Sequence, residues 1–188
     1  MPRFPKRYAD AVARLRVPSG FLVVAVFAWF SQPTAGSLAA GLPVAVLGLA
    51  VRSWAAGCLA KNARLATGGP YAYTRNPLYL GTVVVAAGLA VTARSVGLGV
   101  LFAAVFVFVY LPVIQLEEQH LRSLFPKFAE YAAAVPALWP RFGGGRDGRT
   151  FRWALYVKNQ EYRAALGFAL GALFLLWKVL RWRVVRIF

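Results

Sequence analysis

Apolar and polar residues follow one another along the chain in long blocks, and this pattern predicts a membrane protein. The predominantly apolar segments are residues 17–30, 37–59, 78–93, 96–116 and 164–180. A helix needs about 20 mostly apolar residues to cross a bilayer, so the first segment is short and the third is marginal. Both become spans as halves of tight hairpins, because the connections that follow them are brief and turn-like. We therefore predict an all-α polytopic integral membrane protein with about five transmembrane helices.

Composition agrees with this prediction and extends it. Of the 188 residues, 60% are hydrophobic and 15% are charged, whereas a soluble domain has roughly 25% charged residues. A net charge of +16 would suggest nucleic acid in a soluble protein, but here it favours a surface of anionic lipid. We expect a single domain over 1–188. Its C-terminal part, 150–188, is expected to comprise an amphipathic segment and the last helix, after a flexible linker at 143–149.

The basic residues between the segments predict the orientation. The N-terminal arm and the loops at 60–77 and 117–163 are rich in Lys and Arg, whereas the short connections contain only Arg94. Because basic loops stay in the cytoplasm, we predict a bacterial inner-membrane protein with its N-terminus and both basic loops on the cytoplasmic side. The basic tail after the last segment disagrees with a fifth full span. A re-entrant segment is the alternative, and we favour the span.

The polar region 117–163 contains a predicted amphipathic helix. Its apolar residues recur at steps of three and four over 121–135, which describes one face of a helix. At 100° per residue, Glu117 falls inside this stripe and Glu118 at its edge. Glu117 is therefore expected to face protein or ligand. Pro126 is expected to break the helix near its middle.

The acidic residues are few, and four of the six are expected on solvated surface. These four are Asp10, Glu130, Asp147 and Glu161. Glu117 and Glu118 differ, because they are adjacent carboxylates directly after the fourth apolar segment. Burial there requires a cation or a hydrogen-bond donor as partner. Two interfacial charges that face water are the alternative interpretation.

Familiar catalytic arrangements are missing from the sequence. His120 is the one histidine and Cys58 the one cysteine, so a His-rich or Cys-based metal site is excluded and we expect no metal. No glycine-rich phosphate-binding loop is present. The chemistry that remains depends on positioning reactants more than on reactive side chains.

The stretch GPYAYTRNPLYLG at 69–81 is unusually polar and aromatic for its place between two apolar segments. The glycines and proline at 68–70 predict a turn, and Asn76 before Pro77 predicts an extended residue followed by the first turn of a helix. The free N–H groups at that helix start, together with Arg75, suit a carboxylate. The three tyrosines would form an aromatic wall beside it. An interfacial aromatic belt around a helix that begins with proline is the alternative.

Two motifs together resemble those of a known enzyme family. LAKNARLATGGPYAYTRNPLYLG (59–81) and EEQHLRSLFPKFAEYAAAVPALWPR (117–141) are similar, in order and spacing, to the isoprenylcysteine carboxyl methyltransferase and phospholipid methyltransferase family. The resemblance covers about 45–141. It implies an integral membrane methyltransferase that uses S-adenosylmethionine in a pocket at the cytoplasmic face. Asn76 stands where prenylcysteine enzymes have histidine, which favours a bacterial-type member.

The resemblance also implies site residues. The positions that match the motifs are Gly69, Pro70, Tyr71, Arg75, Asn76, Pro77, Tyr79, Gly81, Glu117, Glu118, Leu121, Tyr131 and Pro136. Arg75 and the helix start at Pro77 are expected to bind the methionine carboxylate. Glu117 is expected to bind the amino group or ribose of the cofactor. Glu118 is expected nearer the substrate, where it accepts a proton, so Arg75 and Glu118 are the expected catalytic residues.

Several functions are still open at this point. The expected acceptor is a membrane lipid or another amphiphile that enters from the bilayer, and no nucleic acid or obligate protein partner is expected. Membrane sterol reductases that bind NADPH share a related helical core, but the paired glutamates favour a methyltransferase. The other alternative is a non-catalytic lipid-binding protein, in which Arg52 extends along the second span towards the membrane surface.

Overall fold

The computed structural model describes residues 4–141 and 150–185, and within these ranges it contains helices and no strand. The expected linker at 143–149 and Asp147 lie outside the described residues. The elements are α1 (Lys6–Phe30), α2 (Ala35–Cys58), the 3₁₀ helix η1 (Gly69–Ala72), α3 (Pro77–Ala93), α4 (Val96–Val105), the π-helical η2 (Phe106–Tyr110), α5 (Leu111–Leu124), α6 (Phe128–Ala134), α7 (Trp153–Lys158) and α8 (Tyr162–Val185). The segments α4, η2 and α5 follow one another without a break and form one long helix, 96–124.

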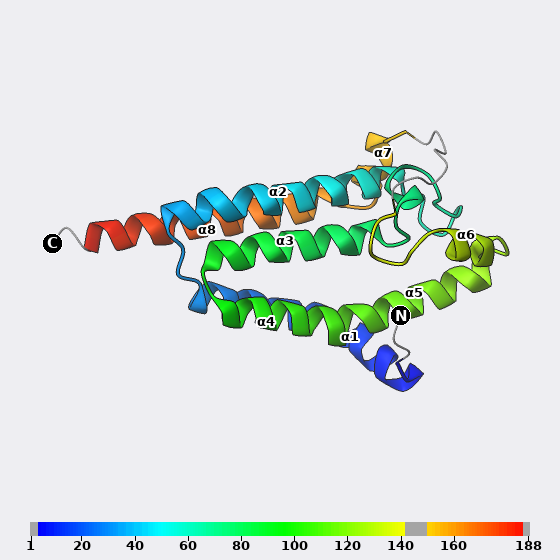
Figure 1. Ribbon diagram of the computed structural model, residues 1–188, viewed down its shortest axis with the longest axis horizontal. Helices are drawn as coiled ribbons and strands as arrows, with labels where there is room; N and C mark the ends of the chain where they lie inside the picture. The colour runs from blue at the N-terminus through cyan, green and yellow to red at the C-terminus, as the bar shows by residue number, and fades with distance from the viewer. Residues whose placement is uncertain (1–3, 142–149, 186–188) are drawn as a thin grey trace.

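The long helices lie side by side in an elongated bundle (Figure 1). By length and composition, α1, α2, the 96–124 helix and α8 can each cross a membrane, and α3 is a shorter apolar helix of 17 residues. The protein is therefore an all-α polytopic membrane protein, as the hydrophobic pattern predicts. Helix α1 begins well before its apolar segment because residues 6–16 are rich in Ala, Lys and Arg, which favour helix.

The two ends of the bundle differ. We call the end formed by the loops 59–76 and 125–141 the loop end; the N-terminus and α7 lie there too (Figure 1). The other end, the turn end, has the short connections between α1 and α2 and between α3 and α4. Helix α8 runs beside α2 to the turn end, where the C-terminus lies. The last segment therefore spans the bundle and is not re-entrant.

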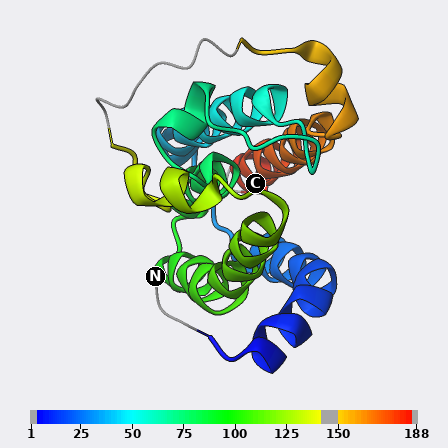
Figure 2. The same ribbon diagram turned by 90° about the vertical axis from the view of Figure 1, so that its right-hand side faces the viewer.

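Seen from the loop end, the helices form two sides (Figure 2). Helix α1 packs against η2 and α5 on one side, whereas α2 packs against α8 on the other. Helix α3 packs against both α2 and α4, so it connects the sides.

The turn end is closed by hydrogen bonds that the turn residues supply. Thr34 and Ser37 form a reciprocal cap at the start of α2, with Ser37 N to Thr34 Oγ1 at 3.2 Å and Thr34 N to Ser37 Oγ at 2.9 Å. Gln32 N donates to Ala93 O at 2.9 Å, which joins the two connections. Lys178 on α8 donates to Ala28 O at 2.9 Å and so binds a carbonyl at the end of α1. Both expected hairpins are therefore present.

Glycine allows α2 and α3 to approach closely. A Cβ added to Gly88 on α3 would lie 2.4 Å from Ala45 N and 2.6 Å from Gly41 O on α2. A Cβ added to Gly48 would lie 2.6 Å from Gly81 O. Small residues at such contacts are typical of membrane helices, whose association depends on close packing and not on the removal of apolar surface from water.

This contact predicts opposite effects for the same substitution at two helical glycines. Gly88→Ala is expected to lower the free energy of unfolding by about 1–3 kcal/mol, because the new methyl group meets backbone atoms of α2. Gly36→Ala is the matched control, since no atom lies within 4 Å of its added Cβ. The control is expected to keep or slightly raise stability, because Ala favours helix over Gly by about 1 kcal/mol. Thermal unfolding of detergent-solubilised protein measures both; equal melting temperatures would contradict the close α2–α3 contact.

Candidate active site

The GPYAYTRNPLYLG stretch folds as a turn followed by the start of a helix, as its sequence predicts. Gly69 has φ +60°, a conformation that glycine adopts without strain, and its added Cβ would lie 2.8 Å from Cys58 Sγ. Pro70 lies in the first turn of η1, and Pro77 lies in the first turn of α3. The stretch thus places Arg75 and Asn76 between the two helical segments at the loop end.

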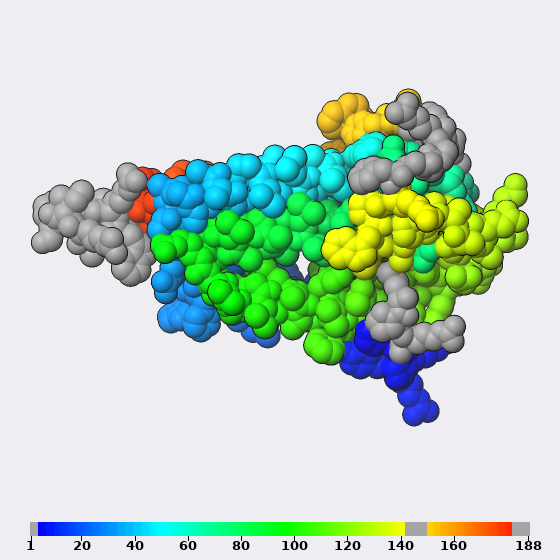
Figure 3. All heavy atoms as spheres, viewed as in Figure 1, coloured from blue at the N-terminus to red at the C-terminus, as the bar shows by residue number. Residues whose placement is uncertain are grey.

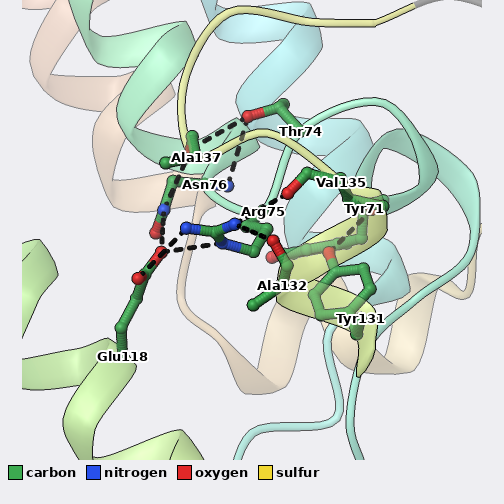
Figure 4. A network of polar contacts seen from close by, with 9 residues as sticks. All are labelled: Tyr71, Thr74, Arg75, Asn76, Glu118, Tyr131, Ala132, Val135 and Ala137. Atoms are coloured by element: carbon green, nitrogen blue, oxygen red, sulfur yellow. Dashed lines mark hydrogen bonds and ion pairs between the residues drawn. The ribbon is translucent and has the colours of Figure 1, made fainter. Parts of the chain in front are cut away.

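Arg75 connects this stretch to the second motif (Figure 4). Its Nε donates to Glu118 Oε1 at 2.9 Å and its Nη2 donates to Glu118 Oε2 at 3.2 Å, an ion pair in which both side chains are largely buried. Its Nη1 donates to the carbonyls of Ala132 and Val135, both at 2.7 Å. Arg75 therefore uses four of its five N–H groups to join α5, α6 and the segment after α6.

The neighbours of Arg75 complete the same connection (Figure 4). Asn76 Nδ2 donates to Ala137 O at 3.0 Å and to Glu118 Oε1 at 3.4 Å. Thr74 Oγ1 donates to the same Ala137 carbonyl at 3.1 Å. The backbone N–H of Arg75 donates to Pro136 O at 2.9 Å. The two motifs that the sequence separates by some 40 residues are thus held together by donors of the first and by carbonyls and the Glu118 carboxylate of the second.

Two tyrosines lie beside this network, the buried Tyr71 and the half-buried Tyr131, and the hydroxyl of Tyr71 is unpaired. Tyr131 Oη donates to the carbonyl of Tyr71 at 2.7 Å. Within the described residues, Tyr71 Oη is a buried side-chain oxygen without a hydrogen-bond partner. Burial, reinforced by the nearby Tyr131, Cys58 and Glu117, raises the pKa of Tyr71 above its usual value. The hydroxyl therefore keeps its proton and can both donate and accept a hydrogen bond.

The order of the two glutamates is the reverse of the prediction. Glu118 is the enclosed carboxylate, whereas Glu117 is exposed and accepts a hydrogen bond from Tyr79 Oη at 2.8 Å. The inward position expected for Glu117 is therefore wrong. The expectation took the stripe of 121–135 as an enclosed face, but in α5 Leu121 is only half-buried and Leu124 is exposed, so the face that Glu117 shares with them does not point into the protein. The break at Pro126 itself is as expected.

Some of the remaining expected site residues belong to the loop-end network, and Gly81 and Leu121 do not. Pro70, Pro77, Asn76 and Pro136 belong to the loop-end network or shape its backbone. Gly81 lies instead in the α2–α3 contact, where an added Cβ would be 2.7 Å from Gly48 O. Leu121 is half-buried on α5, and its carbonyl accepts the N–H of Phe125 at the helix end.

The structure also contains an ion pair that the sequence prediction missed. Glu161, expected on the surface, is buried, and it binds Arg52 of α2 through distances of 2.6 Å and 3.0 Å. Arg52 also donates to Thr82 Oγ1 and, at 3.3 Å, to Leu78 O of α3, so its guanidinium is bound within the protein. An arginine inside an apolar segment requires a partner, and that requirement was the available signal. Asp10 and Glu130 are exposed as expected.

The arrangement suits a small polar ligand with both donor and acceptor groups. Tyr71 offers its hydroxyl, and Glu117 offers a carboxylate that the described residues engage through one oxygen only. The buried, unpaired hydroxyl fits the expectation that a cofactor binds here, since buried polar groups are usually satisfied. No three His, Cys, Asp or Glu side chains of the described residues are grouped as they would be around a metal ion.

Comparison with known proteins finds two metal-resistance proteins among the similar sequences. The chain is 36% identical over 105 residues to the cobalt-zinc-cadmium resistance protein CzcN of Cupriavidus metallidurans. The aligned residues cover 56% of this chain and 48% of CzcN. It is 35% identical over 119 residues to the nickel-cobalt-cadmium resistance protein NccN of Alcaligenes xylosoxydans xylosoxydans. The aligned residues cover 60% of this chain and 56% of NccN. The match thus spans about half the length of each relative. No solved structure matches the chain significantly.

The second comparison concerns protein families. The sequence profile named phospholipid methyltransferase matches residues 38–127, which run from α2 through α5. This segment includes Arg75 and Asn76 of the first motif together with Glu117 and Glu118 of the second. The match agrees with the family that the motifs resemble, and residues 38–127 of this membrane protein are similar to the phospholipid methyltransferase family.

Proposed function

We propose that the protein is an S-adenosylmethionine-dependent methyltransferase that methylates a membrane-partitioned amphiphile at its loop end, on the cytoplasmic side. The observation that carries the proposal is the Arg75–Glu118 network, which brings both motifs of the family segment to one place. The basic loops at that end support the cytoplasmic orientation through the positive-inside rule.

Two residues of the site have hydrogen-bonding capacity left for the cofactor. Glu117 would accept hydrogen bonds from an amino group or ribose hydroxyls, since its position at the surface of α5 leaves it accessible. Tyr71 would bind through its unpaired hydroxyl. When bound, S-adenosylmethionine would supply a sulfonium methyl group to a lone pair of the acceptor, and the electrons of the broken carbon–sulfur bond would stay on sulfur. The proton that an acceptor loses passes to a carboxylate or to water.

The role of Arg75 is more constrained than the motif alone suggests. Four of its N–H groups bind Glu118 and the carbonyls of Ala132 and Val135. Unless Glu118 moves, one N–H on Nη2 is therefore left for the carboxylate of the cofactor. The free N–H groups at the start of α3 are adjacent, since Asn76 makes no side-chain cap there. We propose that both groups hold the cofactor's carboxylate, and that Glu118 lies on the substrate side.

The acceptor is proposed to be a lipid or another amphiphile because the site lies at the end of membrane-spanning helices. The metal-resistance names describe the relatives, which this chain matches over about half their length. We base the proposed function on residues 38–127, which match the phospholipid methyltransferase profile. Positioning and exclusion of water then supply most of the rate increase, in keeping with the few reactive side chains.

Substitutions at Glu117 and Arg75 test cofactor binding. Glu117→Gln is expected to weaken S-adenosylmethionine binding about tenfold, because it removes a charged acceptor while keeping the bond from Tyr79. Arg75→Lys is expected to weaken it at least as much, since lysine cannot join Glu118 and two carbonyls at once. Glu130→Gln, at an exposed carboxylate, is the control. Isothermal titration of the solubilised protein measures affinity; no saturable binding to the wild type, or equal affinity in all variants, would refute the site.

Tyr71 gives a prediction in which stability and binding change in opposite directions. Tyr71→Phe is expected to stabilise the ligand-free protein by about 1–3 kcal/mol, because it removes a buried unpaired hydroxyl. The same variant is expected to lose affinity for S-adenosylmethionine. Tyr131→Phe is the matched control, and it is expected to lower stability because its hydroxyl donates to Tyr71 O. Melting temperatures with and without cofactor separate the two effects; a Tyr71→Phe protein with unchanged affinity would exclude Tyr71 from the pocket.

The acceptor is tested without assuming its identity. Purified protein is incubated with methyl-labelled S-adenosylmethionine and a total bacterial lipid extract, and labelled products are identified by mass. We expect the label in a molecule that extracts with the lipids, and its loss in Glu117→Gln. If only water-soluble molecules gain the label, the protein is a methyltransferase but the membrane acceptor is wrong.

A further inference from the structure

A cavity of about 780 Å³ lies inside the bundle, between the side formed by α1 and α4–η2 and the side formed by α3 and α8. Its walls are almost entirely apolar, with Val23, Phe27, Leu89, Phe102 and Phe168 among the lining residues. In the space-filling view a gap opens between α3 and the long helix beside it, and α1 is visible behind (Figure 3). The volume lies in the range of roughly 300–1,000 Å³ that is typical of small-molecule sites.

Glycines of α1 and α8 border open space in this cavity. Gly20 on α1 and Gly167 and Gly171 on α8 line it, and a Cβ added to any of them would meet no atom within 4 Å. Gly41 and Gly88 are the opposite case, because their added Cβ atoms would clash with a neighbouring helix. The glycines of α1 and α8 are therefore not needed for close packing against another helix. Their missing side chains make the cavity wider.

The charged residues that line the cavity are both basic. Arg16 of α1 and Arg52 of α2 line it, and no Asp or Glu does so among the described residues. Glu161 already neutralises Arg52, so Arg16 leaves a positive charge at the edge of an apolar space. Tyr110 also lines the cavity, and its ring packs edge-on against Tyr79 at 5.8 Å between centroids. Since Tyr79 binds Glu117, the charged part of the cavity adjoins the candidate active site.

We propose that this cavity binds a single-chain amphiphile with an anionic head group, with the hydrocarbon chain between α1 and α8 and the head group near Arg16. Apolar walls favour the chain, and the positive charge of Arg16 attracts the anion. Helices α1 and α8 lie outside the family segment 38–127, so the cavity is formed by the family segment together with flanking helices of this chain. The inference deepens the proposed function, on which it rests, because it names the class of the methyl acceptor.

The experiment uses photolabelling of the full-length protein in nanodiscs. The probe is palmitic acid with a photoreactive diazirine in its chain, and labelled peptides are mapped by mass spectrometry. We expect labels on α1 and α8 at the lining residues. Gly167→Leu and, independently, Gly20→Leu are expected to reduce this labelling about tenfold by filling the cavity, whereas Gly36→Leu, whose added Cβ also meets no atom, is expected to leave it unchanged. Melting temperatures identify variants that fail to fold.

Competition identifies the head group. Unlabelled palmitic acid and lysophosphatidic acid are expected to compete with the probe for the cavity, whereas methyl palmitate is not. Arg16→Gln is expected to weaken the binding of palmitic acid about tenfold. The more effective competitor shows whether the anion is a carboxylate or a phosphate. Equal competition by methyl palmitate would overturn the anionic head group, and labels spread over all lipid-facing helices in every variant would overturn the cavity. A protein that passes these tests but binds no S-adenosylmethionine would refute the proposed function and keep the cavity.

Discussion

The loop end depends on one guanidinium group. Arg75 donates to both carboxylate oxygens of Glu118 and to the carbonyls of Ala132 and Val135, so three separate stretches of chain meet at one side chain. Carbonyls at the end of a short helix otherwise lack partners, and a buried carboxylate requires a positive charge. Arginine satisfies both needs because its donors lie in one plane and point in several directions. Lysine has no comparable geometry.

Close helix packing places that arginine correctly. Gly41, Gly48, Gly81 and Gly88 bring α2 and α3 so near that side chains do not separate their backbones. The start of α3, and with it Arg75, is therefore fixed relative to the end of α2. The same short separation lets Arg52 reach Leu78 O and Thr82 on α3 while it binds Glu161. Packing within the membrane and polar contacts at its edge thus support each other.

The helices of the bundle pack with different closeness, and this difference explains the cavity. Small residues close the contact between α2 and α3, whereas the glycines of α1 and α8 border open space. Helix α8 is attached by polar contacts near its ends, through Glu161 to Arg52 and through Lys178 to Ala28 O. Between these attachments it leaves room for a ligand. A bilayer supplies apolar molecules of suitable length directly to such a space.

The sequence by itself determined the class of the protein, because hydrophobic segments of bilayer length permit few structures other than membrane helices. It also identified the hairpins, the break at Pro126 and the two motifs, which depend on local residue preferences. The tertiary structure decided what local rules do not contain: that Glu118 and not Glu117 is enclosed, and that Glu161 is buried against Arg52. Packing between residues far apart in the chain decides which face of a helix is enclosed and which partner a buried charge finds. For the same reason only the folded chain revealed the cavity.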